Sequence, residues 1–107
     1  MNIINLTAHN VDICDEYGKV IKTYKPSGIV VRNAWFPEQV DIVDGVSLMI
    51  RKNERIVNLP EPQEDTMYIV SDIVRTACAD RYDLISPAQQ VKINGRVVGC
   101  MAFMCNG

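Results

Sequence analysis

The stretch VDIVDGVSLMI, residues 40–50, carries the clearest structural signal in this chain. Two apolar segments, Val40–Val43 and Val46–Ile50, flank the dipeptide Asp44-Gly45. A two-residue type I′ turn needs positive φ at both of its central positions, and Asp-Gly meets that need. The stretch therefore predicts a β-hairpin.

A second hairpin is predicted near the C-terminus. There Asn94-Gly95 separates Val91–Ile93 from Arg96–Gly99, and Asn-Gly favours the same type of turn.

The N-terminal third predicts shorter strands divided by turns. Apolar and polar residues alternate in Val11–Cys14, and Lys19–Tyr24 is expected to return beside it as the second strand of a hairpin. Gly18 supplies positive φ in the turn between them. Asn2–Leu6 and Ile29–Arg32 are two further expected strands.

The middle of the chain predicts a loop, a strand and one helix. Leu59-Pro60-Glu61-Pro62 cannot lie in a central strand, because proline has no N–H to donate. Met67–Val70 has the composition of a buried strand. Apolar residues then recur at helical spacing, which predicts a helix over Asp72–Ala79, with Ser71 as its N-cap.

These elements predict a mainly β (α+β) fold: a small antiparallel sheet or barrel-like domain with one short helix. At 107 residues the chain has the usual length of one domain, here residues 1–107. A sheet of this size leaves open edges that invite pairing, so we expect a homo-oligomer.

Charge and hydropathy exclude several classes of function. The net charge is −2 and no basic run is present, so non-specific nucleic-acid binding is not expected. No apolar run is long enough to suggest a membrane span, and no signal peptide is recognisable at the start. We therefore expect a cytoplasmic protein without membrane contact, whose four cysteines are reduced thiols.

No complete catalytic or metal-binding motif is present, and we expect no catalytic residues, metal or cofactor. His9 is the only histidine, and a nucleophile and an orienting group in contact with it cannot be identified from sequence. Cys100 and Cys105 make one loose pair, whereas structural zinc commonly takes two close pairs.

Several residues have the chemistry of a small anionic-ligand site. Arg32 and Arg81 could hold phosphate groups, and Trp35 or Tyr82 could stack on a base. The alternatives are structural: an Arg81–Asp83 ion pair that holds a loop, Trp35 and Phe36 covering the core, and Ser71 acting as a cap alone.

The chain also resembles a family of small, largely uncharacterised proteins of bacteriophages and bacterial mobile elements. The matching motifs, in order, are Asn5-Leu6-Thr7-Ala8-His9, Pro26-Ser27-Gly28 before Arg32, Leu59-Pro60-Glu61-Pro62 before Tyr68-Ile69-Val70-Ser71, Arg81-Tyr82-Asp83 before Ser86-Pro87, and Asn94-Gly95-Arg96 before Gly99-Cys100. The chain departs from the family pattern at Ala8, where proline is usual, and over Asn33–Asn58.

The resemblance implies an accessory protein in the cytoplasm of an infected bacterium. Small phage proteins of this kind include sponges that sequester nucleotide signals of host defence, commonly as oligomers. The leading hypothesis is thus a non-enzymatic binder of a nucleotide-like ligand. Its candidate site residues are Asn5, His9, Ser27, Arg32, Trp35, Ser71, Arg81, Tyr82 and Asp83. The alternatives are an interaction module that inhibits a host protein and a nucleotide-processing hydrolase that uses His9.

Overall fold

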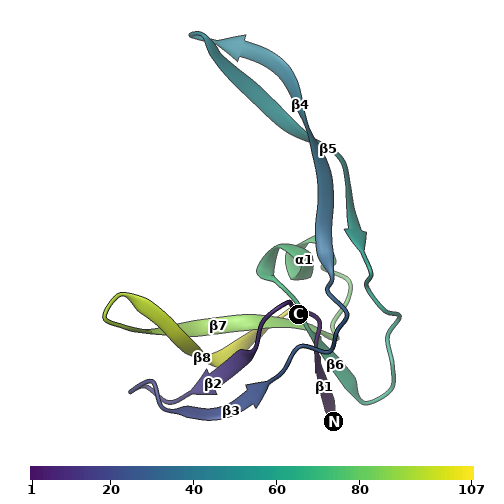
Figure 1. Cartoon of the computed structure of the whole chain (residues 1–107). Helices are drawn as coiled ribbons and strands as arrows, with labels where there is room; N and C mark the ends of the chain where they lie inside the picture. The colour runs from purple at the N-terminus through teal and green to yellow at the C-terminus, as the bar shows by residue number, and fades with distance from the viewer.

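The computed structural model describes residues 1–107 and is mostly β, with 58% of residues in strands. This confirms the predicted fold class. The elements are β1 (Asn2–Asn5), β2 (Val11–Cys14), β3 (Val20–Tyr24), β4 (Arg32–Val43), β5 (Val46–Val57), β6 (Thr66–Ile69), α1 (Asp72–Ala77), β7 (Leu84–Ile93) and β8 (Arg96–Cys105). Six of the strands form one sheet, and β4 and β5 form a separate ribbon (Figure 1).

The main sheet is mixed, which corrects the prediction of an antiparallel sheet. Its strand order is β1-β6-β7-β8-β2-β3. The pairs β7–β8 and β2–β3 are antiparallel, whereas β1–β6, β6–β7 and β8–β2 are parallel. The antiparallel pairs are hairpins with local turn signals. The parallel pairs β1–β6 and β8–β2 join segments far apart in the chain, for which the sequence carries no comparable signal. The parallel pair β6–β7 joins consecutive strands through α1, the kind of crossover that parallel strands need.

The strands β4 and β5 pair only with each other and project from the main sheet (Figure 1). We call this ribbon, residues 32–57, the arm. The predicted turn is confirmed, with φ of 51° at Asp44 and 75° at Gly45. Each strand of the arm has 12 residues, so the hairpin is longer than predicted. Because of the arm, the radius of gyration is 16.7 Å, against about 13 Å for a compact chain of this length.

The other predicted hairpins are confirmed with shifted ends. The β7–β8 turn has φ of 52° at Asn94 and 78° at Gly95, and both strands extend further than expected. In the first hairpin β2 has the predicted bounds, β3 begins at Val20, and Gly18 has φ of 85°.

One predicted strand is wrong. Of Ile29–Arg32, only Arg32 lies in a strand, where it begins β4. The preceding residues cross from the main sheet to the arm. The backbone N–H of Val31 donates to Leu6 on this path, so the segment is tied to the loop after β1 rather than to a strand ladder.

The core lies on both faces of β6 and β7. Adjacent residues of a strand point to opposite faces, and Tyr68 and Ile69 are both almost fully buried. Tyr68 belongs to the cluster under α1 with Leu6, whereas Ile69 belongs to the opposite cluster with Val11. These two strands therefore form the centre of the molecule.

The helix α1 packs beside β7 and the base of β4. Ser71 is its N-cap as predicted, accepting a hydrogen bond from the N–H of Val74 at 3.3 Å. The helix ends at Ala77, two residues before the predicted end, and Cys78–Asp80 form a turn. The structure contains no helix with the length and apolarity needed to cross a membrane.

Candidate functional site

A groove of about 430 Å³ lies at the base of the arm, and we call it the arm-base groove. Its lining comes from four places: the loop after β1, the segment before β4, both strands of the arm, and the start of α1. The lining includes Val30, Arg32, Asn33, Trp35, Arg51, Ser71 and Ile73. Three of them, Arg32, Trp35 and Ser71, were candidate ligand-binding residues from sequence.

Two guanidinium groups lie in the groove lining. Arg32 is exposed and forms no ion pair. The side chain of Arg51 is half-exposed, and its nearest carboxylate oxygen, from Glu54, is 3.8 Å away. An exposed pair at this distance contributes little to stability, so Arg51 is free to change partner. The groove therefore offers two cations to an anion.

Trp35 supplies an aromatic surface beside these cations. The guanidinium carbon of Arg51 lies 5.0 Å from the centre of the indole ring, within cation–π range. Trp35 is 42% exposed and stands on the arm, so the alternative that it covers the core is wrong. Phe36, at 57% exposure, does not cover the core either.

Asn33, also in the groove lining, has an unusual polar environment. Its side-chain N–H donates to Glu54 at 2.6 Å, while its carbonyl oxygen is buried and has no hydrogen-bond partner. Leaving a buried acceptor unsatisfied costs about 1–3 kcal/mol. The Asn33 oxygen is thus an acceptor in the groove lining that has no partner within the chain.

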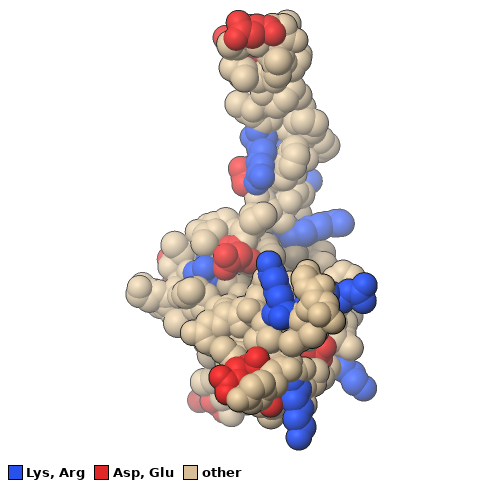
Figure 2. All heavy atoms as spheres, turned by 90° about the vertical axis from the view of Figure 1, so that its left-hand side faces the viewer, with Lys and Arg blue, Asp and Glu red and all other residues tan.

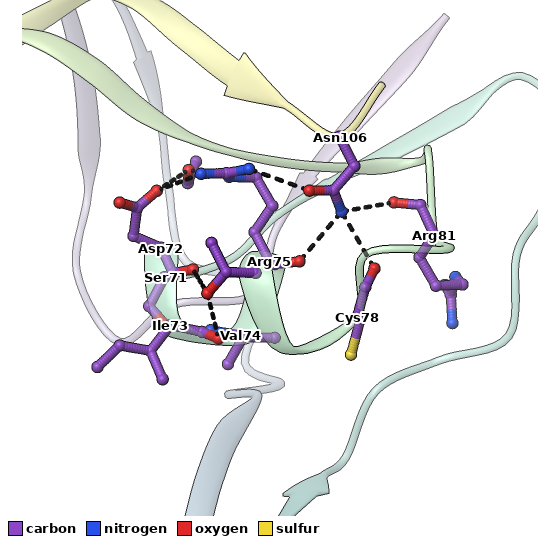
Figure 3. A network of polar contacts seen from close by, with 10 residues as sticks. Ser71, Asp72, Ile73, Val74, Arg75, Cys78, Arg81 and Asn106 are labelled. Atoms are coloured by element: carbon purple, nitrogen blue, oxygen red, sulfur yellow. Dashed lines mark hydrogen bonds and ion pairs between the residues drawn. The ribbon is translucent and has the colours of Figure 1, made fainter.

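The start of α1 forms the opposite side of the groove. Ser71 lies next to Asp72 and Ile73 on the first turn, and Figure 3 shows its bond to Val74. The Ser71 hydroxyl oxygen is therefore already occupied as a cap. Ile73 and Val30 are 54% and 38% exposed and give the groove an apolar part.

Arg81 lies away from this groove, beyond the C-terminal end of α1 (Figure 3). Its Nε donates to Oδ1 of Asp83 and its Nη2 donates to Oδ2, both at 2.8 Å, and Nη2 also donates to the carbonyl of Pro60 at 3.0 Å. Both side chains are mostly buried. The structure thus favours the ion-pair alternative, and Arg32 and Arg81 do not share a site.

The Arg81–Asp83 pair shifts both pKa values. Hydrogen bonds from Arg81 hold the pKa of Asp83 below its usual value, and the same bonds raise the pKa of Arg81. Both shifts favour the charged forms. This pair ties the loop at Pro60 to the start of β7 and has a structural role.

The remaining candidates from sequence lie outside the groove lining. The side chain of Asn5 is buried and bonds to the carbonyls of His9 and Tyr24, which closes the loop after β1. His9 is exposed and takes part through its carbonyl. The Ser27 hydroxyl bonds within its own turn, to Ile29. Tyr82 is 68% exposed in the turn before β7.

A polar network around α1 was not foreseen from the sequence (Figure 3). Arg75 donates to Ser86, to Asp72 and to Asn106, at 2.8 to 3.0 Å. The Ser86 hydroxyl donates to Asp72 at 2.7 Å, and this bond, followed by those from Arg75, lowers the pKa of Asp72. The network attaches the helix to β7 and to the C-terminal segment.

No group of three or more potential metal-ligating side chains is placed to hold a metal ion. The four cysteines are all free, and burial raises the pKa of the Cys100 thiol. Searches against protein-family models, curated proteins and solved structures found no match to this chain. The candidate site therefore rests on its own geometry, namely two arginines, one tryptophan and an apolar part in one groove.

Proposed function

We propose that this chain binds a small anionic ligand that carries a planar ring, such as a nucleotide, in the arm-base groove. One observation supports this most directly: Arg32, Arg51 and Trp35 line the same groove. Arginine suits phosphate because its planar donors can bind two oxygens at once, and indole stacks on ring systems.

Each groove residue has a distinct role in this proposal. Arg32 and Arg51 hold the phosphate groups, with Arg51 in the place that sequence reasoning gave to Arg81. The exposed face of Trp35 stacks on the ring, and Asn33 accepts a hydrogen bond from it. The chain acts by holding the ligand without converting it. A role as a phage sponge for a nucleotide signal of host defence is the form of this function that the family resemblance suggests.

Thermal melting of the purified protein tests the proposal, against mono-, di- and cyclic nucleotides and ADP-ribose derivatives. A ligand at about 100 times its dissociation constant stabilises by about 2.7 kcal/mol. For a domain of this size that is on the order of 10 °C. We expect a shift of this size with one class of ligand. A flat panel would argue against the proposal.

The matched variants are Arg32→Gln and Arg96→Gln. Both arginines are exposed, but Arg96 begins β8 at the tip of the other long hairpin, outside the groove. The ligand-induced shift should disappear in Arg32→Gln and persist in Arg96→Gln. The ligand should also be recovered intact after denaturation. Accumulation of a product would favour the alternative of a nucleotide-processing enzyme, and His9→Ala would then be the next variant.

A second candidate function, inhibition of a host protein by strand addition, is favoured by the open edge of β3. This strand ends the main sheet, and Val20 and Ile21 on it are 47% and 68% exposed. An unpaired edge with apolar side chains can accept an extended segment from another protein. A host protein should then co-purify with the chain in equal stoichiometry, and Ile21→Lys should abolish this co-purification. It should be retained in Tyr17→Lys, which alters the exposed turn before β3.

A further inference from the structure

The arm has an apolar surface that its own chain does not cover. A two-stranded ribbon is marginally stable in water unless a further strand or layer packs on it. Here β4 and β5 pair only with each other, and away from its base the arm extends clear of the main sheet (Figure 1). Large apolar side chains along it are exposed: Trp35, Phe36, Val40, Ile42, Val43, Val46, Leu48, Met49 and Ile50.

The strand register separates the two faces of the arm. Side chains of directly paired residues share a face, and neighbours along a strand alternate. The pairs Val43–Val46, Asp41–Leu48, Glu38–Ile50 and Phe36–Lys52 therefore lie on one face, which we call the Leu48 face. Met49 and Arg51 lie on the other, the Met49 face, together with Trp35, which contacts Arg51. The groove opens on the Met49 face, and the Leu48 face carries most of the remaining apolar side chains.

Charge is distributed unequally along the arm. The outer part, residues 38–50, has only acidic charges, and the inner part has mainly basic ones. The outer charges are Glu38, Asp41 and Asp44, and the inner charges are Arg32, Arg51, Lys52, Glu54 and Arg55. Figure 2 shows the carboxylates gathered at the tip and basic side chains lower on the arm. The arm is thus acidic at its tip and basic at its base.

We propose that the arms of two copies of this chain pack antiparallel through their Leu48 faces. In this arrangement the acidic tip of each arm lies against the basic base of the other, and Asp41 of one copy faces Lys52 of the second. A two-fold interface uses the same patch on both partners, so the patch must be self-complementary. Asp41 and Lys52 lie at opposite ends of this face and meet this condition. The ion pair of Lys52 with Glu38 of its own arm, at 3.6 Å, is exposed and contributes little to stability, so Lys52 can pair with Asp41 of the second copy. A parallel arrangement would bring like charges together.

Sedimentation velocity over a concentration series tests this inference on the full chain without added ligand. The wild type should sediment as a dimer that dissociates on dilution. Leu48→Asp places a carboxylate twice in the interface and should weaken association by at least about 100-fold. Met49→Asp is the matched control, since the neighbouring side chain is similarly exposed but lies on the other face. A wild type that stays monomeric, or equal effects of the two substitutions, would overturn the inference.

Charge reversal tests the antiparallel orientation. Asp41→Lys and Lys52→Glu each create two like-charge contacts in an antiparallel dimer, so each variant alone should associate about tenfold more weakly. An equimolar mixture of the two variants should recover association, because both contacts between positions 41 and 52 in the mixed dimer are then between opposite charges. In a parallel dimer each reversal would replace one like-charge contact by another and leave association unchanged. That result, or a mixture that fails to recover, would contradict the proposed orientation.

This inference is independent of the ligand proposal, because association is measured without nucleotide and through the other face of the arm. If the Leu48 face instead binds a different protein, the chain alone will be monomeric, and the face will be buried only in the complex with that protein. Such an outcome overturns self-association while leaving the arm-base groove untouched.

Discussion

The guanidinium of Arg51 lies over the indole ring of Trp35, with the guanidinium carbon 5.0 Å from the ring centre, and the two residues come from opposite strands of the arm. Their contact joins β4 and β5 at the arm-base groove. Since Trp35 is the only tryptophan in the chain, its fluorescence reports on this contact without interference from other indoles. The geometry thus supplies a spectroscopic probe of the candidate site.

The first prediction separates the roles of the two groove arginines. Arg51→Gln should change the emission of Trp35 in the free protein, because the cation over the ring is lost. Arg32→Gln should leave that emission unchanged. Each substitution removes a charge-assisted contact to the ligand and should weaken binding on the order of tenfold or more. Fluorescence spectra and ligand titrations of both variants check this. Unaltered affinity in both would remove the arginines from the site.

The second prediction concerns the buried pair of Arg81 and Asp83. Removing the guanidinium leaves the Asp83 carboxylate and the Pro60 carbonyl without partners, so Arg81→Ala should lower the free energy of unfolding by about 2–3 kcal/mol. Ligand affinity at the arm-base groove should stay unchanged while the variant is folded. Urea unfolding measures the loss of stability, and a ligand titration measures the affinity. A folded Arg81→Ala variant with reduced affinity would show that Arg81 contributes to ligand binding.

The third prediction is a pH dependence set by Asp83. Because its pKa is lowered in the folded protein by hydrogen bonds from Arg81, the unfolded chain binds more protons below the usual aspartate value of about 3.9. The stabilisation is therefore fully present above this value and is lost as pH falls through the folded pKa. Asp72, with a pKa shifted in the same direction, acts in the same window.

Urea unfolding at about pH 6 and about pH 3 measures this effect. Asp83→Asn should be less stable than the wild type at the higher pH, and the difference between the two proteins should shrink at the lower pH. A difference that is constant with pH would show that the carboxylate charge does not stabilise the fold.

Sequence reasoning predicted the hairpins because their signals are local. Asp44-Gly45 and Asn94-Gly95 adopt the positive φ values that their turns require, and no distant residue is needed to specify this. The parallel pairs β1–β6 and β8–β2 depend on contacts between distant segments, and β1 pairs with β6 across more than half of the chain. A single amino-acid sequence does not show which distant segments pair, so these two strand pairings could not be predicted.

The candidate site was predicted in part, and one β-bulge explains much of the rest. Counting outward from the Asp44-Gly45 turn without interruption would place Trp35 on the same face as Lys52. The register shift between Gln39 and Asp41 moves the ladder by one residue, so Pro37 pairs with Arg51. A one-residue slip changes the face of every later side chain. Arg51 was therefore missed, although the turn that anchors the count was identified.

Arg81 is the converse case: it was predicted to bind a ligand because of its residue type, but in the fold it forms an internal ion pair with Asp83. Asp83 is two positions away and was recognised as a possible partner, but sequence alone could not decide between the pair and the ligand. The Pro60 carbonyl favours the internal ion pair, because it accepts a further hydrogen bond from the same guanidinium. That contact spans 21 positions and depends on where the loop before β6 lies.

The last prediction concerns Asn106, one residue after the end of β8. Its amide nitrogen donates to the carbonyls of Arg75, Cys78 and Arg81 at 3.0, 3.1 and 3.0 Å, so two protons are shared among three acceptors (Figure 3). Its oxygen accepts from the Arg75 guanidinium at 3.0 Å. The carbonyls of Arg75 and Cys78 also accept from the backbone N–H groups of Cys78 and Arg81, so Asn106 gives each of them a second hydrogen bond and adds a donor for the Arg81 carbonyl.

Asn106→Ala should therefore lower the free energy of unfolding by about 1–3 kcal/mol, because it removes the side-chain donor to the Arg81 carbonyl and the acceptor of one Arg75 guanidinium hydrogen bond. Gly107→Ala is the control at the next position, since an added Cβ there meets no atom within 4 Å. Urea denaturation of both variants measures the difference, and hydrogen exchange should show faster opening of α1 in Asn106→Ala alone. If the two variants unfold at the same urea concentration, the helix is held by its Arg75 contacts with Asp72 and Ser86 instead.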